Sequence, residues 1–200
     1  MILSQQQLDA LREVGNIGSG NAASALAEFI NLRIDMSVPS ANMVSINEIP
    51  EKAGGTNSVV TGVMLKMSGP VSGRFLLLIP ENTSIWLLQR LIPDCKAINL
   101  HMLSEVESSC LKEIGNILAG SFSNALSILT QTPIINSLPY MIFDSVGNIL
   151  NKTITEMPIR SNNAVMIETS FFEEKNDLRI HIFLIPVSLE VLLEKIGIGS

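Results

Sequence analysis

The residue pattern best suited to chemistry is a glutamate followed three positions later by an asparagine, and it occurs twice. The pairs are Glu13 with Asn16 and Glu113 with Asn116. Residues three apart project side by side from a helix. Asparagine is neither a base nor a nucleophile at neutral pH, but its carboxamide can orient a water, and a glutamate can form an ion pair with a lysine. Such a pair could complete a site in which a partner supplies the reactive group and the metal.

Water attack on a phosphoryl group fits such a contribution, because this reaction needs chiefly positioning and charge compensation. An aspartyl phosphate on a partner protein, beside that partner's Mg²⁺ and lysine, would suit a donated Glu–Asn pair. We therefore expect a protein that acts on another protein and has no cofactor or metal ion of its own.

The second pair belongs to a longer repetition at an offset of one hundred residues. Residues 9–39 laid over 109–139 match at Leu11, Glu13, Gly15, Asn16, Ile17, Gly20, Ala25, Leu26, Ile34, Ser37 and Pro39, each with its counterpart one hundred positions later. The same offset lays Ser4 and Gln7 over Ser104 and Glu107. Both pairs fit the S-x-x-[EQ] capping box at a helix start. Two helices are therefore predicted to begin near Ser4 and Ser104.

Each half is predicted to continue with three extended segments and a short helix. The extended segments lie near 33–48, 58–68 and 71–80, and near 134–150, 163–171 and 178–186; the short helices are IWLLQRL (85–91) and VLLEKI (191–196). A lone three-stranded unit has too little core. We therefore predict one domain over residues 1–200, made of two pseudo-symmetric repeats, about 1–100 and 101–200. The expected fold is α/β in the broad sense: an α+β two-layer structure with one largely antiparallel sheet and the two long helices on its surface.

The closely spaced Gly15, Gly18 and Gly20 do not predict a phosphate-binding loop. A dinucleotide or P-loop fingerprint needs a preceding strand and a helix that starts at the glycines. Here the glycines fall about a dozen residues into a helix, and no GK[ST] follows. A nucleotide-binding regulator is therefore disfavoured.

A helical projection divides each long helix into a core face and an outer face. The expected core positions are Leu11, Val14, Gly18, Ala22, Ala25 and Phe29, and Leu111, Ile114, Leu118, Phe122, Ala125 and Leu129. The expected outer positions are Asp9, Glu13, Asn16, Gly20, Ala23 and Ala27, and Ser109, Glu113, Asn116, Gly120, Ser123 and Ser127. On this prediction Gly18 and Leu118 are alternative ways of filling a core position.

Gly20 and Gly120 then lie on the outer face, although an interior helical glycine costs about 0.5–1 kcal/mol relative to alanine. Two interpretations stay open. Either another helix of the same chain crosses closely over the small residues, or a partner lies flat along the helix with the glutamate and asparagine reaching into it.

The composition narrows the classes of partner and compartment. The net charge is −6 without a basic cluster, so nucleic acid is not an expected partner. Mean hydropathy is +0.37, yet no apolar run approaches the roughly 18–20 residues of a membrane span, and the N-terminus lacks signal-peptide features. We expect a cytoplasmic protein. Cys95 and Cys110 show no CxxC or zinc-ligand spacing, which predicts two reduced structural thiols.

The fixed positions combine into the pattern [D/S]-x3-E-x2-N-x22-P. It occurs as Asp9, Glu13, Asn16 and Pro39, and again as Ser109, Glu113, Asn116 and Pro139. This pattern resembles that of the CheC/CheX/FliY family of chemotaxis phosphatases, which dephosphorylate the response regulator CheY. The resemblance covers essentially the whole chain. Two intact motifs in about 200 residues, without an added flagellar-switch domain, are most similar to the CheC-type members.

The resemblance implies roles for these positions. Asn16 and Asn116 would position the hydrolytic water in line with the phosphoryl group, and the two glutamates would hold the regulator's lysine. Asp9 and Ser109 would support the helix surface or contact the partner, Gly20 and Gly120 would keep it low, and Pro39 and Pro139 would shape the strand that leaves each helix.

The family also implies a partnership with the receptor deamidase CheD. The alternative function is a non-catalytic adaptor that binds phosphorylated CheY or CheD with negligible hydrolysis. Two intact Glu–Asn pairs favour activity, since a pure adaptor has no evident need for both.

Overall fold

The computed structural model describes residues 4–37, 40–155, 162–173 and 176–197. Within these ranges, no helix combines the length and apolarity needed to cross a membrane. The helices are α1 (Gln5–Ile30), α2 (Ile49–Lys52), α3 (Glu81–Leu91), α4 (Glu105–Thr130), α5 (Val146–Thr155) and α6 (Leu189–Lys195), with short 3₁₀ turns η1 (Ile46–Glu48) and η2 (Leu100–Met102). The strands are β1 (Asp35–Met36), β2 (Ser40–Ser45), β3 (Val59–Ser68), β4 (Gly73–Pro80), β5 (Ile135–Asn136), β6 (Tyr140–Ser145), β7 (Asn163–Glu173) and β8 (Asn176–Pro186).

The two long helices start where the sequence predicts. Ser4 and Ser104 are the N-caps of α1 and α4, and each forms a complete capping box with the residue three positions on. Each helix runs for 26 residues and ends in a left-handed residue, Asn31 or Gln131. The predicted short helices are present as α3 and α6.

The strands form one eight-stranded sheet in which every described pairing is antiparallel. Its order is β1-β7-β8-β4-β3-β5, with β2 beside β7 and β6 beside β3. Strands β1 and β2 of the first half therefore pair with β7 of the second half, whereas β5 and β6 pair with β3 of the first half. The α+β class and the largely antiparallel sheet are confirmed.

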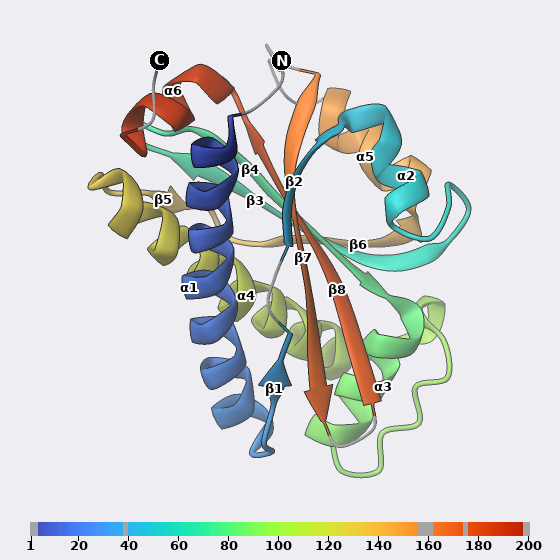
Figure 1. Cartoon of the computed structure of the whole chain (residues 1–200). Coiled ribbons are helices and arrows are strands. Elements are labelled where there is room, and N and C mark those ends of the chain that lie inside the picture. Colours follow the sequence, from blue (N-terminus) through green and yellow to red (C-terminus); the bar gives the residue numbers. More distant parts are fainter. Residues whose placement is uncertain (1–3, 38–39, 156–161, 174–175, 198–200) are drawn as a thin grey trace.

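Helices cover both faces of this sheet, which corrects the two-layer description. One core lies between the sheet and α1, α3, α4 and α6; it includes Val63, Leu65, Leu77 and Leu184. A smaller core lies on the opposite face beneath α2 and α5; it includes Met64, Leu76, Leu78 and Phe183. The alternation along the strands explains both cores, because successive side chains point to opposite faces. Figure 1 shows α2 and α5 grouped together, apart from α1 and α4.

Helices α2 and α5 were not predicted. The expected strand near 134–150 divides into β5, β6 and the start of α5, and the one near 33–48 into β1, β2 and η1. In α5 the buried residues Val146, Ile149, Leu150 and Thr153 follow helical spacing, which marks an amphipathic helix rather than a strand.

The long helices pack on each other as well as on the sheet. Gly18 lies against Phe122, and a Cβ atom added to Gly18 would be 2.5 Å from Cδ1 of that ring. Gly115 lies against Val63 of β3 in the same way, at 2.6 Å from Cγ1. Gly18 and Leu118 are both buried, as predicted, but they are not exchangeable, because a larger side chain at 18 would overlap the Phe122 ring.

This double packing also corrects the predicted helix faces. Ala23 and Ser123, expected outside, are buried, while Phe29, expected in the core, is 37% exposed. Ala25, Ala27, Ser127 and Leu129 are half-buried. The other predicted core positions of both helices are buried.

Candidate functional site

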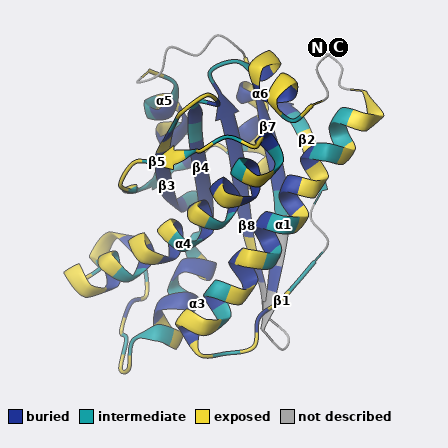
Figure 2. Ribbon diagram, turned by 90° about the vertical axis from the view of Figure 1, so that its left-hand side faces the viewer, coloured by how far each residue is buried: buried dark blue, intermediate teal, exposed yellow. Residues whose placement is uncertain are grey.

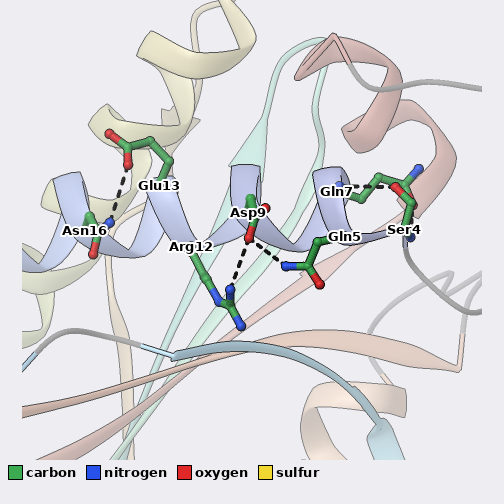
Figure 3. A network of polar contacts seen from close by, with 7 residues as sticks. All are labelled: Ser4, Gln5, Gln7, Asp9, Arg12, Glu13 and Asn16. Atoms are coloured by element: carbon green, nitrogen blue, oxygen red, sulfur yellow. Dashed lines mark hydrogen bonds and ion pairs between the residues drawn. The ribbon is translucent and has the colours of Figure 1, made fainter.

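Glu13 and Asn16 lie side by side on the solvent face of α1. Both side chains are exposed, and the Nδ2 group of Asn16 donates a hydrogen bond of 3.4 Å to Oε2 of Glu13. Figure 3 shows the Glu13 carboxylate turned toward Asn16. This bond is long, so a partner could break it at little cost. The amide orientation leaves the Asn16 carbonyl oxygen available to accept a hydrogen bond from a water.

Asp9 lies one turn earlier on the same helix and is already engaged. Its Oδ1 accepts from Nε2 of Gln5 at 2.9 Å and from a guanidinium nitrogen of Arg12 at 3.0 Å (Figure 3). The Asp9 and Arg12 side chains are 57% and 50% exposed, so this ion pair is screened and adds little stability. Asp9 thus orders the exposed side chains that precede the Glu–Asn pair.

The corresponding residues of α4 are exposed in the same sequence. Ser109, Glu113 and Asn116 all face solvent, while Leu111, Ile114 and Leu118 are buried between them. Exposed and buried residues alternate along both long helices in Figure 2. Each helix therefore presents its glutamate and asparagine outward and holds the opposite side in the core.

The start of α4 is fixed by Glu107, a buried carboxylate with several donors. Its Oε2 accepts from the Ser104 backbone N–H at 2.7 Å and from the Ser104 hydroxyl at 2.8 Å. Its Oε1 accepts from the Cys95 thiol at 3.2 Å. Led by the Ser104 backbone bond, these hydrogen bonds lower the pKa of Glu107 despite its burial. Glu107 therefore stays ionised and anchors the helix that carries Glu113 and Asn116.

Both cysteines are free and half-buried near this helix start. Burial raises the pKa of Cys95, and the hydrogen bond to the Glu107 carboxylate raises it further. Burial also raises the pKa of Cys110. Both groups therefore favour the neutral thiol. In the described parts of the chain, no group of three or more His, Cys, Asp or Glu side chains could hold a metal ion.

The surroundings of Gly20 and Gly120 distinguish the two explanations for small residues on the outer face, a crossing helix of the same chain or a partner protein. A Cβ atom added to Gly20 or Gly120 would have no heavy atom of the described residues within 4 Å. The close crossing of α1 and α4 involves Gly18 and Phe122 instead. Packing within the chain therefore accounts for the glycine at 18 but gives no reason for those at 20 and 120.

We call Asp9, Glu13 and Asn16 on α1, and Ser109, Glu113 and Asn116 on α4, the exposed row of each helix. Beyond Gly20 and Gly120 the row continues at positions that the helical projection did not assign to the outer face. Ser24 and Asn124 are exposed, whereas Ala23 and Ser123 are buried. Ser24 donates to the Gly20 carbonyl at 3.0 Å, and the buried Ser123 donates to Oδ1 of Asn136 in β5 at 2.8 Å. The hydroxyl of Ser127, also expected outside, accepts from the Ile134 N–H at 3.2 Å.

Of the two motif prolines, the structure describes Pro139 alone. Pro139 is half-buried directly before β6. The neighbouring Ser137 binds the Lys66 backbone of β3 through its N–H and its hydroxyl, at 2.9 Å and 3.0 Å. Pro39 lies outside the described residues. The geometry at Pro139 agrees with a role in shaping the strand that follows the helix.

Comparisons with known proteins extend these observations. Residues 7–43 and 106–135, which contain both Glu–Asn pairs, match the CheC-like family. The chain is 35% identical over 190 residues to the CheY-P phosphatase CheC of Bacillus subtilis (strain 168), covering 92% of this chain and 90% of that protein.

Solved structures share the fold at low sequence identity. The Thermotoga maritima FliY structure has a TM-score of 0.76 at 17% identity and covers 100% of this chain and 98% of its own. A chain of the FliG–FliM complex from H. pylori has a TM-score of 0.71 at 13% identity, covering 96% and 100%. At these identities the likeness concerns the fold alone.

Proposed function

The chain belongs to the CheC-like family, and from this premise we propose that it is a phosphatase that hydrolyses the aspartyl phosphate of the response regulator CheY. The observation that carries the proposal is the paired exposure of Glu13 with Asn16 and of Glu113 with Asn116 on two helices with the same start and length. The B. subtilis relative carries this activity in its name.

In the proposed reaction, the side chains of this protein position groups rather than form bonds. The carbonyl oxygen of Asn16 or Asn116 accepts a hydrogen bond from a water and holds it in line with the phosphorus. The water oxygen attacks phosphorus, the bond to the aspartyl oxygen breaks, and a proton of the water passes to the released phosphate. The leaving group is the aspartate carboxylate, which remains part of the regulator.

The glutamate of each pair has the charge for a complementary task. Glu13 or Glu113 pairs with the phosphate-site lysine of the regulator, which aligns the two proteins and fixes the asparagine over the phosphoryl group. A carboxylate has two acceptor oxygens, so Glu13 can pair with the lysine while its Oε2 still accepts the 3.4 Å bond from Asn16. The Mg²⁺ ion belongs to the regulator, and this protein contributes no cofactor.

The outer glycines, Gly20 and Gly120, fit the same proposal. At Gly20 and Gly120 the helix surface is low and unobstructed, so the regulator's backbone could approach the helix one turn beyond each asparagine. Asp9 and Ser109 precede the glutamates on the same exposed row. Each would contact the regulator or order the neighbouring side chains of its own helix. CheD is a proposed second partner on the family resemblance.

The test is the decay of phosphorylated CheY with wild-type protein, Asn16→Ala, Asn116→Ala and the double variant. Loss of a positioned water should lower the double variant's acceleration about a hundredfold or more, while each single variant keeps the activity of its intact site. Asn21→Ala is the matched control, because Asn21 is also exposed on α1 but lies off the Glu13–Asn16 row. Full activity in the double variant would refute these sites.

A non-catalytic adaptor that binds phosphorylated CheY or CheD is the second candidate, because a chain of the FliG–FliM complex shares the fold and a fold by itself does not imply catalysis. It predicts that wild-type protein binds phosphorylated CheY without accelerating its decay. The same assay therefore separates the two functions.

A further inference from the structure

The exposed row of α4 begins with an apolar residue that the phosphatase proposal does not use. Val106 is 66% exposed and lies three residues before Ser109 and seven before Glu113. At 3.6 residues per turn, these spacings place all three along one face of the helix. Valine is also a weaker helix former than glutamine or glutamate, so helix stability does not explain its presence there.

Two further large apolar side chains are exposed just before this helix. Met102 is 79% exposed and Ile98 is 80% exposed. Met102 and Val106 flank the N-cap Ser104, two residues to either side. Isolated apolar residues on a surface are ordinary, but several within nine residues at the end of a functional row indicate a contact surface.

The first turn of α1 is polar where that of α4 carries Val106. The residue one hundred positions before Val106 is Gln6, which is exposed and has glutamine on both sides. The two long helices thus present the same Glu–Asn pair after different first turns: glutamines on α1, and on α4 Val106 between two glutamates.

We infer that Val106 and Met102 are specificity-determining contacts of the α4 site, covered by phosphorylated CheY when its phosphate lies at Glu113 and Asn116. This inference rests on the proposed function. Ten residues of helix separate Val106 from Asn116, which is about 15 Å. A standard interface of about 800 Å² per partner is roughly 30 Å across, so one centred on Asn116 reaches Val106.

The consequence is a difference in recognition between two sites of the same chemistry. CheY gains the apolar contact with Val106 at the α4 site, where the α1 site offers Gln6, so the α4 site should bind it more tightly. The rate of the chemical step, set by the Glu–Asn pair, should not depend on these contacts.

The test measures KM and kcat for phosphorylated CheY in two backgrounds. In Asn16→Ala, where only the α4 site works, adding Val106→Gln with Met102→Gln should raise KM about tenfold and leave kcat unchanged. In Asn116→Ala, where only the α1 site works, the same changes should alter neither constant. A reciprocal Gln6→Val in that second background should lower KM.

Each other outcome overturns the inference in a recognisable way. An unchanged KM in the Asn16→Ala background shows that CheY does not cover the apolar residues; a simultaneous loss of self-association in sedimentation would assign them to a second copy. A lower kcat with unchanged KM would place their effect in the chemistry. If wild-type protein does not accelerate decay, the proposed function itself fails. Both replaced side chains are exposed, so the variants should fold like wild type. Thermal unfolding checks this.

Discussion

At the scale of single residues, two glycines two positions apart on α1 have opposite surroundings. Gly18 is pressed against the Phe122 ring, while Gly20 faces open space, as does Gly120 on α4. Gly18→Ala should destabilise the fold by about 1–3 kcal/mol through overpacking. Gly20→Ala and Gly120→Ala should stabilise it by about 0.5–1 kcal/mol, because alanine is the better helix former. Urea denaturation measures all three.

Equal destabilisation by the three changes would contradict the packing described for α1 and α4. A milder loss for Gly18→Ala combined with Phe122→Leu than for Gly18→Ala alone would identify the ring as the group that is overlapped. The retention of glycine at 20 and 120 despite this cost supports a role in approach by a partner.

His181 makes the stability depend on pH. It is buried in β8, and its Nδ1 atom has no hydrogen-bond partner among the described residues. Burial lowers its pKa, while the Glu168 carboxylate, 4.0 Å from Nδ1, acts in the opposite direction. The folded protein therefore holds the imidazole neutral, whereas the unfolded chain takes up a proton below its ordinary pKa of about 6.5. The contribution of neutral His181 to the free energy of unfolding is fully present above that pH and should be lost as the pH drops below it.

The measurement is the free energy of unfolding between pH 7.5 and 5, a range chosen to straddle the ordinary histidine pKa of about 6.5. His181→Gln cannot be protonated and should flatten the profile. Glu168→Gln removes the charge that raises the pKa of His181, so the decline should continue to lower pH. Identical profiles for wild type and His181→Gln would exclude His181 as the source.

At the scale of elements, the capping boxes hold the two long helices in place. Ser4→Ala and Ser104→Ala each remove the side-chain acceptor for an N3 backbone N–H and should cost about 1 kcal/mol. The loss should be larger at Ser104, because its hydroxyl also donates to the buried Glu107. Thermal denaturation compares the two, and Ser108→Ala, inside α4 rather than at its cap, is the control.

A larger loss at Ser4 would show that the Glu107 network adds nothing to the start of α4. Because this network precedes Ser109 and Glu113 by one or two turns, we also expect Ser104→Ala to weaken the α4 site more than Ser4→Ala weakens the α1 site.

At the scale of the whole molecule, each half completes the sheet of the other. Asp35 and Met36 of β1 pair with Phe172 and Phe171 of β7, and β6 pairs with β3. We propose that residues 1–200 form one domain of two repeats that cannot fold separately. Residues 1–100 alone should be unfolded by circular dichroism. The full chain should unfold in one transition, with Trp86 fluorescence and circular dichroism coinciding. A folded isolated half would contradict this.

Sequence patterns predicted the parts of the fold that depend on local chemistry. Ser4 with Gln7 and Ser104 with Glu107 located both helix starts, because a capping box is a short-range signal. Local patterns did not predict α5: an extended segment is expected near 134–150, although Val146, Ile149 and Leu150 have helical spacing. The burial of Ala23 and Ser123 depends on neighbours distant in sequence, so a single-helix projection could not assign it.

The site follows the same division. The exposure of Glu13, Asn16, Glu113 and Asn116 was predictable from helical periodicity. The contact of Gly18 with Phe122 was not predictable, because it joins residues 104 positions apart. This contact distinguishes Gly18, which packs against another helix, from Gly20 and Gly120, which do not.

The most direct test of the central claim uses Asn16→Ala with Asn116→Ala, assayed for binding and hydrolysis together. We predict that the double variant binds CheY, activated with Mg²⁺ and beryllium fluoride as a stable phosphate mimic, with a Kd close to that of wild type. We also predict that phosphorylated CheY decays in the variant's presence at the rate of CheY alone. Acceleration by the double variant equal to that of wild type would show that Asn16 and Asn116 do not position the hydrolytic water.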